Sequence, residues 1–206
     1  MLKSRYPNIS KKISNNLGTI FSKIPISPTT WTILSLLFAF VGFLALYKKF
    51  LFYGFLFFLA AGFIDAVDGA VARKKNKETN LGAYIDGIAD RLVESMLILG
   101  LMFYGIPEFY IPGYIWLAIL LFFGSCMTTF AKVYADHRKA LTEKELKNMG
   151  GILERTERVS LILAGMLLGY LYDEKYITYS IALAAALAAA TFMQRVHYTI
   201  KHEKKE

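Results

Sequence analysis

Six long apolar stretches constrain the fold of this chain more than any other feature of its sequence. Most of them approach the ~20 residues that a helix needs to cross the ~30 Å hydrocarbon core of a bilayer. The chain is 55% hydrophobic, and its charged residues, 19% of the total, gather between these stretches. Soluble domains of this size seldom combine such features. We therefore expect an all-α integral membrane protein with six transmembrane helices, near residues 28–47, 50–68, 88–104, 112–135, 159–172 and 176–194.

The segment before the first stretch has a different pattern. Its apolar residues from Ile9 to Ile20 are spaced by four, four and three, with basic residues between them, so they share one helical face. We expect an amphipathic interfacial helix on the membrane surface, and a disordered basic tail is the alternative. Ser27 and Pro28 then predict an N-cap and a first turn for the first span. The length fits one domain over 1–206, made of a juxtamembrane helix (1–24), a six-helix bundle (about 28–194) and a tail (195–206).

Basic residues are distributed unevenly among the connections. If both termini lie on one side of the membrane, that side holds 19 of the 24 lysine and arginine residues, and three lie opposite. The positive-inside rule then predicts a multi-pass protein of the cell membrane with cytoplasmic termini and cytoplasmic connections 69–85 and 136–158. The net charge of +8 is therefore a topology signal, and we expect no nucleic-acid partner.

Four aspartates stand where the second and third spans meet the cytoplasm. Asp65 and Asp68 are three residues apart, and Asp86 and Asp90 are four apart. In a helix, each pair shares a face. The two helices are antiparallel neighbours joined by a short connection, so we expect the four carboxylates to converge on the cytoplasmic side.

Clustered carboxylates repel one another unless a cation compensates their charge. Oxygen-only ligands suit Mg²⁺, Mn²⁺ or Ca²⁺, whereas zinc would more often recruit histidine or cysteine, which this segment lacks. We expect Mg²⁺ or Mn²⁺, and four carboxylates can hold two ions, as in many phosphoryl-transfer sites. In the structural alternative, the acids only pair with Arg73 and Arg91 to hold helices together.

Small residues and one arginine lie between the aspartates. The small residues leave room for close approach of helices and a ligand, and Arg73 offers a forked donor for phosphate oxygens. These small residues are Gly69, Ala70, Ala72, Gly82 and Ala83.

Written as spacing, the segment is D-x2-D-G-x2-A-R-x8-G-x3-D-x3-D. It resembles the signature of the CDP-alcohol phosphotransferase family at every fixed position. The resemblance implies an enzyme that transfers a substituted phosphate from a CDP-linked lipid, such as CDP-diacylglycerol or CDP-archaeol, to an alcohol and releases CMP. It also implies a homodimer. The implied metal ligands are Asp65, Asp68, Asp86 and Asp90, with Asp90 also the catalytic base, and the implied nucleotide and diphosphate site is Asp68, Gly69, Ala72, Arg73 and Gly82.

Two further stretches, TFAKVYAD and GGILERTER, bear on the acceptor. They are similar to stretches of phosphatidylinositol-phosphate synthases and their archaeal relatives. The resemblance implies that Lys132 and Arg158, with Arg155 as a third donor, bind the phosphate of inositol 1-phosphate. Such donors favour a phosphorylated polyol over a neutral alcohol. In the structural alternative, these residues are ordinary cytoplasmic flanks or partners of Glu154 and Glu157.

Several functional alternatives stay open. The alternative acceptors are glycerol 3-phosphate and serine, and the alternative donor is CDP-inositol. A cation transporter would also place acids in a membrane, but its ions would cross vesicles and CDP compounds would not bind. A catalytically silent scaffold would show no activity with any donor.

Overall fold

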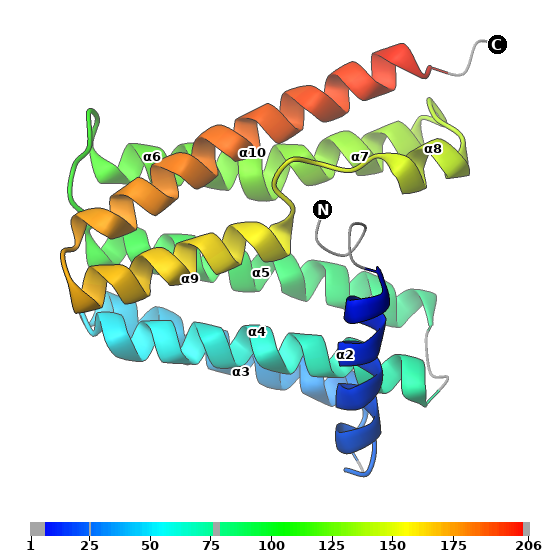
Figure 1. Cartoon of the computed structure of the whole chain (residues 1–206), viewed down its shortest axis with the longest axis horizontal. Helices are drawn as coiled ribbons and strands as arrows, with labels where there is room; N and C mark the ends of the chain where they lie inside the picture. Colours follow the sequence, from blue (N-terminus) through cyan, green and yellow to red (C-terminus); the bar gives the residue numbers. More distant parts are fainter. Residues whose placement is uncertain (1–6, 25, 76–78, 204–206) are drawn as a thin grey trace. The chain divides into compact units, whose positions relative to one another are not determined.

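The computed structural model describes residues 7–24, 26–75 and 79–203, and the side chains of 7–13 and 28 are outside that description. The chain divides into two compact units, of which one ends at Tyr104 and the other begins at Gly105. The first unit contains α2 (Pro7–Phe21), α3 (Pro28–Tyr47), α4 (Leu51–Lys74) and α5 (Asn80–Tyr104) (Figure 1). The second contains α6 (Gly113–Ile119), the π-helix η1 (Leu120–Met127), α7 (Thr128–His137), α8 (Glu143–Asn148), α9 (Arg155–Leu171) and α10 (Lys175–Lys201).

Helix α3 begins where the sequence predicts. Ser27 is its N-cap, with a proline in the first turn, and the Ser27 hydroxyl accepts a hydrogen bond from the Thr30 backbone N–H at 3.2 Å. At the other end of the helix, Leu46 is fully buried. A Cβ built on Gly54 of α4 or on Gly100 of α5 would lie 2.5 or 2.8 Å from the Leu46 side chain. The two glycines therefore let α3, α4 and α5 pack closely around one leucine.

Helix α2 crosses α4 within the first unit (Figure 1). Its last turns cover a cluster formed by Trp31, Ile64, Val67 and Val71, against which Leu17 and Phe21 pack. The structure has a helix over Pro7–Phe21, within the segment 1–24, and its place at a membrane interface stays a prediction. Residues 1–6 of the predicted segment, and the side chains of 7–13 that would define its apolar face, lie outside the described part.

In the second unit, α6, η1 and α7 run as one continuous rod, and α10 packs along it and on α9 (Figure 1). Helices α9 and α10 approach so closely that a Cβ on Gly165 would lie 1.8 Å from the Ser180 hydroxyl. A Cβ on Gly169 would lie 2.4 Å from Ile177. Gly165 and Gly169 are four residues apart, and this small-xxx-small spacing is typical of packing between membrane helices.

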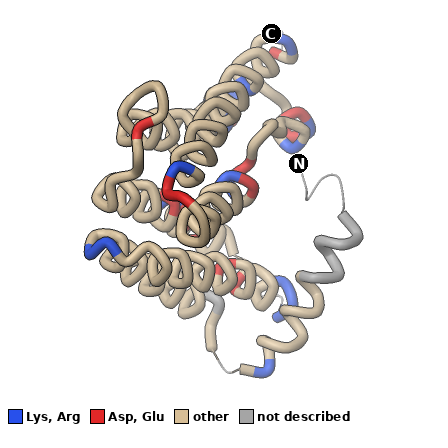
Figure 2. Tube along the Cα trace, turned by 60° about the vertical axis from the view of Figure 1, so that its left-hand side comes forward, with Lys and Arg blue, Asp and Glu red and all other residues tan. Residues whose placement is uncertain are grey.

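Within the part of the chain that the structure describes, four rods are long and apolar enough to span a membrane: α3, α4, the α6–η1–α7 rod and α10. The sequence also predicts spans in α5 and α9. Helix α5 begins eight residues before the apolar stretch and therefore also includes Asp86, while Asp90, Arg91 and Glu94 lie within the stretch itself. Helix α9 has 17 residues, with charges in its first turn. Figure 2 shows long uncharged stretches along the helices, with most charges near helix ends and connections.

Candidate metal and phosphate sites

Three of the four predicted aspartates come together in the first unit. Asp65 and Asp68 lie on α4 and Asp86 lies on α5, and each offers a carboxylate oxygen within 4.8 Å of the other two. Asp68 is 4% exposed and Asp65 is half-buried. The predicted helical spacing of both aspartate pairs is confirmed, because both pairs lie inside helices.

The donor set fits a hard divalent cation. All three groups are carboxylates, and Mg²⁺ and Mn²⁺ prefer such oxygen ligands. Three negative charges this close together, one of them buried, need a compensating charge. A divalent ion held by Asp65, Asp68 and Asp86 would supply that charge.

Asp68 has a partner that the sequence does not reveal. The hydroxyl of Thr32, on α3, donates a hydrogen bond to Asp68 Oδ2 at 2.9 Å, and both side chains are buried. One turn further along α3, the Ser35 hydroxyl donates to the Ala61 carbonyl at 3.1 Å. Both hydroxyls therefore connect α3 to α4, but only Thr32 reaches a candidate metal ligand. Hydrogen bonds of this kind orient ligating carboxylates.

Arg73 follows the aspartates on the last turn of α4. Its NH1 and NH2 atoms lie 3.5 Å from the position that a Cβ on Gly69 would occupy, so the guanidinium lies beside the residue after Asp68. Arg73 also donates from Nε and NH2 to the hydroxyl of Ser14 on α2, at 3.2 and 2.9 Å. Ala72, beside Arg73 in sequence, is half-buried.

Gly82 lies at the start of α5. Its backbone N–H donates to the Thr79 hydroxyl at 3.0 Å, and the Ala83 N–H donates to the Thr79 carbonyl at the same distance. Thr79 therefore acts as an N-cap for α5. A Cβ on Gly82 would itself lie 3.0 Å from the Thr79 hydroxyl, so a larger residue would disturb this cap.

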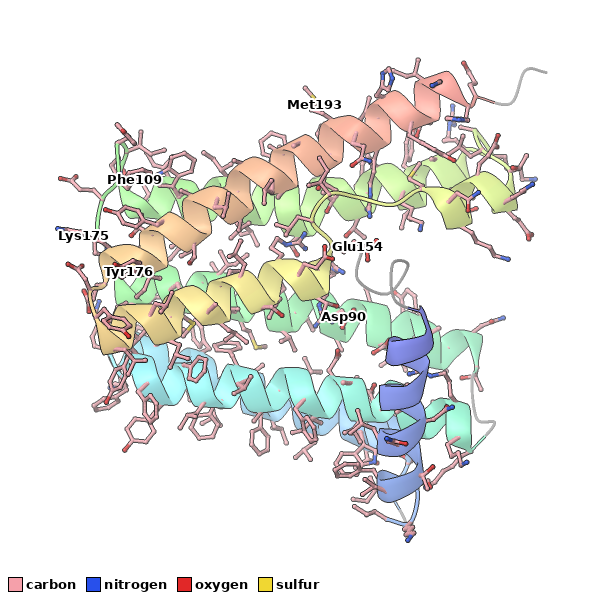
Figure 3. All side chains as sticks on the ribbon, in the orientation of Figure 1. Asp90, Phe109, Glu154, Lys175, Tyr176 and Met193 are labelled. Atoms are coloured by element: carbon pink, nitrogen blue, oxygen red, sulfur yellow. The ribbon has the colours of Figure 1, made fainter. Side chains whose placement is uncertain are left out.

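Asp90 lies on α5, one turn beyond Asp86, and outside the group of three (Figure 3). The next turn holds Glu94, which is fully buried and pairs with Arg91 at 3.1 Å. This ion pair lies within α5, so it is not the pairing between the aspartates and Arg91 that the structural alternative describes.

The predicted acceptor residues lie in the second unit. Lys132 is half-buried on α7 and within electrostatic range of Arg195 and Glu154. Arg155, also half-buried, is the first residue of α9, whose N-cap is Glu154 (Figure 3). The Glu154 backbone N–H donates to Glu157 at 3.1 Å, which completes a capping box. The structure thus surrounds Lys132 with charges of both signs.

Arg158 differs from the other two basic residues because it is only 1% exposed. Its Cδ and Nε lie 3.1 Å from the position of a Cβ on Gly124, inside the π-helix, so this arginine packs where Gly124 leaves room. π-helical turns occur often at functional sites. Arg195, which the sequence indicates only as a cytoplasmic flank, reaches the same rod, and its NH1 donates to the Thr128 carbonyl at 2.5 Å.

Comparison with known proteins places these residues in a family. Residues 26–193 match the family described as CDP-alcohol phosphatidyltransferase. An archaetidylinositol phosphate synthase from Methanothermobacter thermautotrophicus is 33% identical over 139 residues, which are 68% of this chain and 65% of that relative. Another, from Pyrococcus horikoshii, is 28% identical over 204 residues, 96% of this chain and 95% of the relative.

Solved structures with the same fold come from a phosphatidylinositol phosphate synthase of Mycobacterium tuberculosis. Its complex with manganese and citrate aligns with a TM-score of 0.74 at 23% identity, over 91% of this chain and 88% of the other. Its complex with CDP-DAG aligns with a TM-score of 0.74 at 24% identity, over 91% and 94%. The likeness shows the fold. The family match confirms the family, and with it the enzyme class, that the aspartate segment predicts.

Proposed function

The chain belongs to the CDP-alcohol phosphatidyltransferase family, and we propose that it transfers the substituted phosphate of a CDP-linked lipid to inositol 1-phosphate, with release of CMP. The observation that carries the proposal is the group of three carboxylates, Asp65, Asp68 and Asp86, within 4.8 Å of one another. They occupy fixed positions of a family motif in which every position is filled.

Asp65, Asp68 and Asp86 would hold the metal, Mg²⁺ or Mn²⁺, and Asp90 would complete the set if two ions bind. The manganese complex of the M. tuberculosis synthase supports a divalent metal as cofactor. When bound, such ions stabilise the negative charge that develops on the diphosphate and the leaving CMP. Thr32 would keep the Asp68 carboxylate in one orientation through the bond at 2.9 Å.

Asp90 is proposed as the catalytic base. Its place one turn from Asp86, outside the group of three, suits a carboxylate that removes a proton from an acceptor hydroxyl. Arg73 would bind oxygens of the donor diphosphate, because a guanidinium presents paired N–H groups to phosphate. Gly69, Ala72 and Gly82 would leave space for the nucleotide, and the CDP-DAG complex of the M. tuberculosis synthase supports a CDP-lipid as donor.

For the acceptor, we propose that Lys132, Arg155 and Arg158 bind the phosphate. A dianionic phosphomonoester would gain most from such donors. Arg158 would act from a buried position, where charge interactions are stronger than in water. The relatives named as archaetidylinositol phosphate synthases support an inositol phosphate. Glycerol 3-phosphate is the second candidate, since it presents the same phosphate chemistry.

The proposal extends to the membrane arrangement. Six spans, α5 and α9 included, with both termini and the aspartates on the cytoplasmic side, follow from the apolar stretches and the positive-inside rule. The N-terminal helix would lie at the interface, and the protein would be a homodimer in the cell membrane.

An acceptor screen tests this function. Purified protein in detergent, with Mg²⁺ and CDP-archaeol or CDP-diacylglycerol, receives inositol 1-phosphate, inositol, glycerol 3-phosphate or serine, and the lipid products are identified by mass spectrometry. We expect product with inositol 1-phosphate and far less with free inositol. Lys132→Ala should raise the KM for the phosphorylated acceptor and leave the KM for the CDP-lipid unchanged, with Lys144→Ala, at an exposed position of α8, as control. A preference for free inositol would refute the roles of Lys132, Arg155 and Arg158.

A further inference from the structure

Helix α2 makes an unusually close contact with the last turns of α4. A Cβ on Gly18 would lie 2.8 Å from the Ala70 carbonyl oxygen and 3.2 Å from the Lys74 Cβ. A backbone oxygen cannot move aside as the end of a flexible side chain can, so only glycine allows this approach. The two helices are therefore fitted to each other at this point.

The contact between Ser14 and Arg73 lies about one helical turn further along the same interface between α2 and α4. Ser14 is four residues before Gly18 on α2, and Arg73 is three residues after Ala70 on α4, so each pair lies on one helical face. The two hydrogen bonds, at 3.2 Å from Nε and 2.9 Å from NH2, meet at a single oxygen, Ser14 Oγ. The close approach at Gly18 thus sets the position of Ser14 relative to the guanidinium.

We propose that Ser14 is a positioning residue for the donor diphosphate, because it holds the guanidinium of Arg73 by one edge and leaves the other edge for substrate. The inference rests on the proposed function of Arg73 as a diphosphate-binding residue. A guanidinium has five N–H donors, and the serine takes up two of them, so at most three remain for phosphate oxygens. A long arginine side chain loses rotamer freedom when it binds, and a side chain already held in place loses less.

This role gives α2 a second task beside that of an interfacial helix. The helix contributes a side chain that reaches the family motif from outside it, 59 residues earlier in the sequence. Since Arg73 serves the donor, loss of the Ser14 hydroxyl should affect donor binding and leave acceptor binding unchanged. A purely structural role of Ser14 would not separate the two substrates.

The test measures the binding of CDP-diacylglycerol to the full-length protein in detergent with Mg²⁺, by isothermal titration, and the KM values of both substrates from CMP release. We expect Ser14→Ala to raise the donor Kd and KM about fivefold, which corresponds to the net contribution of a typical hydrogen bond. At saturating donor, kcat should stay near the wild-type value. Ser14→Thr should restore donor binding because it keeps the hydroxyl.

Two controls identify the route of the effect. Thr19→Ala removes a hydroxyl of α2 that donates within the helix, to the Asn15 carbonyl at 2.8 Å, and should leave the donor Kd unchanged. In an Arg73→Lys background, Ser14→Ala should have little further effect, because the residue through which it acts is gone. Circular dichroism should show a folded Ser14→Ala protein, since alanine is the better helix former.

The outcomes separate this inference from the proposed function. If the wild-type protein binds CDP-diacylglycerol and Ser14→Ala binds it equally well, or loses the same factor in the Arg73→Lys background, the role of Ser14 is overturned and the proposed function stands. If the wild-type protein neither binds the CDP-lipid nor releases CMP, both fall.

Discussion

Replacement of Thr32 by valine removes the buried hydroxyl that donates to Asp68 Oδ2 and keeps the shape of the side chain. A hydrogen bond to a charged group contributes about 1.5–3 kcal/mol, and its loss in a buried site leaves the carboxylate with one donor fewer. Residues that orient metal ligands typically change metal affinity by about 10–100-fold when they are mutated, which is the same energy range. We therefore expect Thr32→Val to weaken Mg²⁺ or Mn²⁺ binding by about that factor.

The assay is a titration of Mn²⁺ into detergent-solubilised protein, followed by calorimetry or by the electron paramagnetic resonance of free Mn²⁺. Thr32→Ser keeps the hydroxyl and should bind the metal nearly as tightly as the wild type. Ser35→Ala is the matched control, because it removes a buried hydroxyl of the same helix that bonds to a neutral carbonyl of α4. It should lower the melting temperature and leave metal affinity unchanged. If Thr32→Val and Ser35→Ala were equally destabilised and bound the metal equally well, Thr32 would be an ordinary packing residue.

Three further predictions follow from single contacts. Asp90→Asn should abolish CMP release while metal-dependent CDP binding, measured by titration, persists; loss of binding instead would make Asp90 primarily a ligand. Gly151→Ala should lower stability by about 1–3 kcal/mol in thermal unfolding, because its Cβ would lie 2.4 Å from Thr191, whereas Gly150→Ala, in open space, should cost far less. Hydrogen bonds from Thr142, the N-cap of α8, to the Glu145 carboxylate lower the pKa of Glu145. The ionised carboxylate therefore stabilises α8 fully above pH 4.5, its ordinary pKa, and this stabilisation is lost as the pH falls below that value. Hydrogen exchange of the α8 amides, corrected for the intrinsic effect of pH, should speed up at low pH in the wild type and respond much less in Glu145→Gln.

Features that depend on local sequence were predictable. The N-cap at Ser27 needs only a serine before a proline and an apolar run, and the structure confirms it. The aspartate pairs needed only helical spacing, since residues three or four apart share a face wherever the helix lies. The apolar stretch from residue 88 indicates the hydrophobic part of α5 and not its start, because a threonine cap and helix packing extend the helix over polar turns from Asn80.

Features that depend on distant partners could not be predicted in the same way. Thr32 and Ser14 bond to residues 36 and 59 positions away, and nothing in their neighbourhood distinguishes them from other hydroxyl residues of α3 and α2. The π-helix at Leu120–Met127 has no sequence signal, and Gly124 within it gives space to an arginine of another helix. The family resemblance implies a role for Lys132, but its proximity to Arg195 depends on the packing of α10 on the α6–η1–α7 rod.

The central claim is that the aspartate group of this chain supports transfer from a CDP-linked lipid. The most direct measurement is CMP release from CDP-archaeol or CDP-diacylglycerol with inositol 1-phosphate, with Mg²⁺ and with EDTA in its place, for the wild type and for Asp68→Asn. We predict CMP only with Mg²⁺ and the intact aspartate. CMP release that persists in EDTA or in Asp68→Asn, or no CMP with any of the acceptors under any condition, would contradict the account.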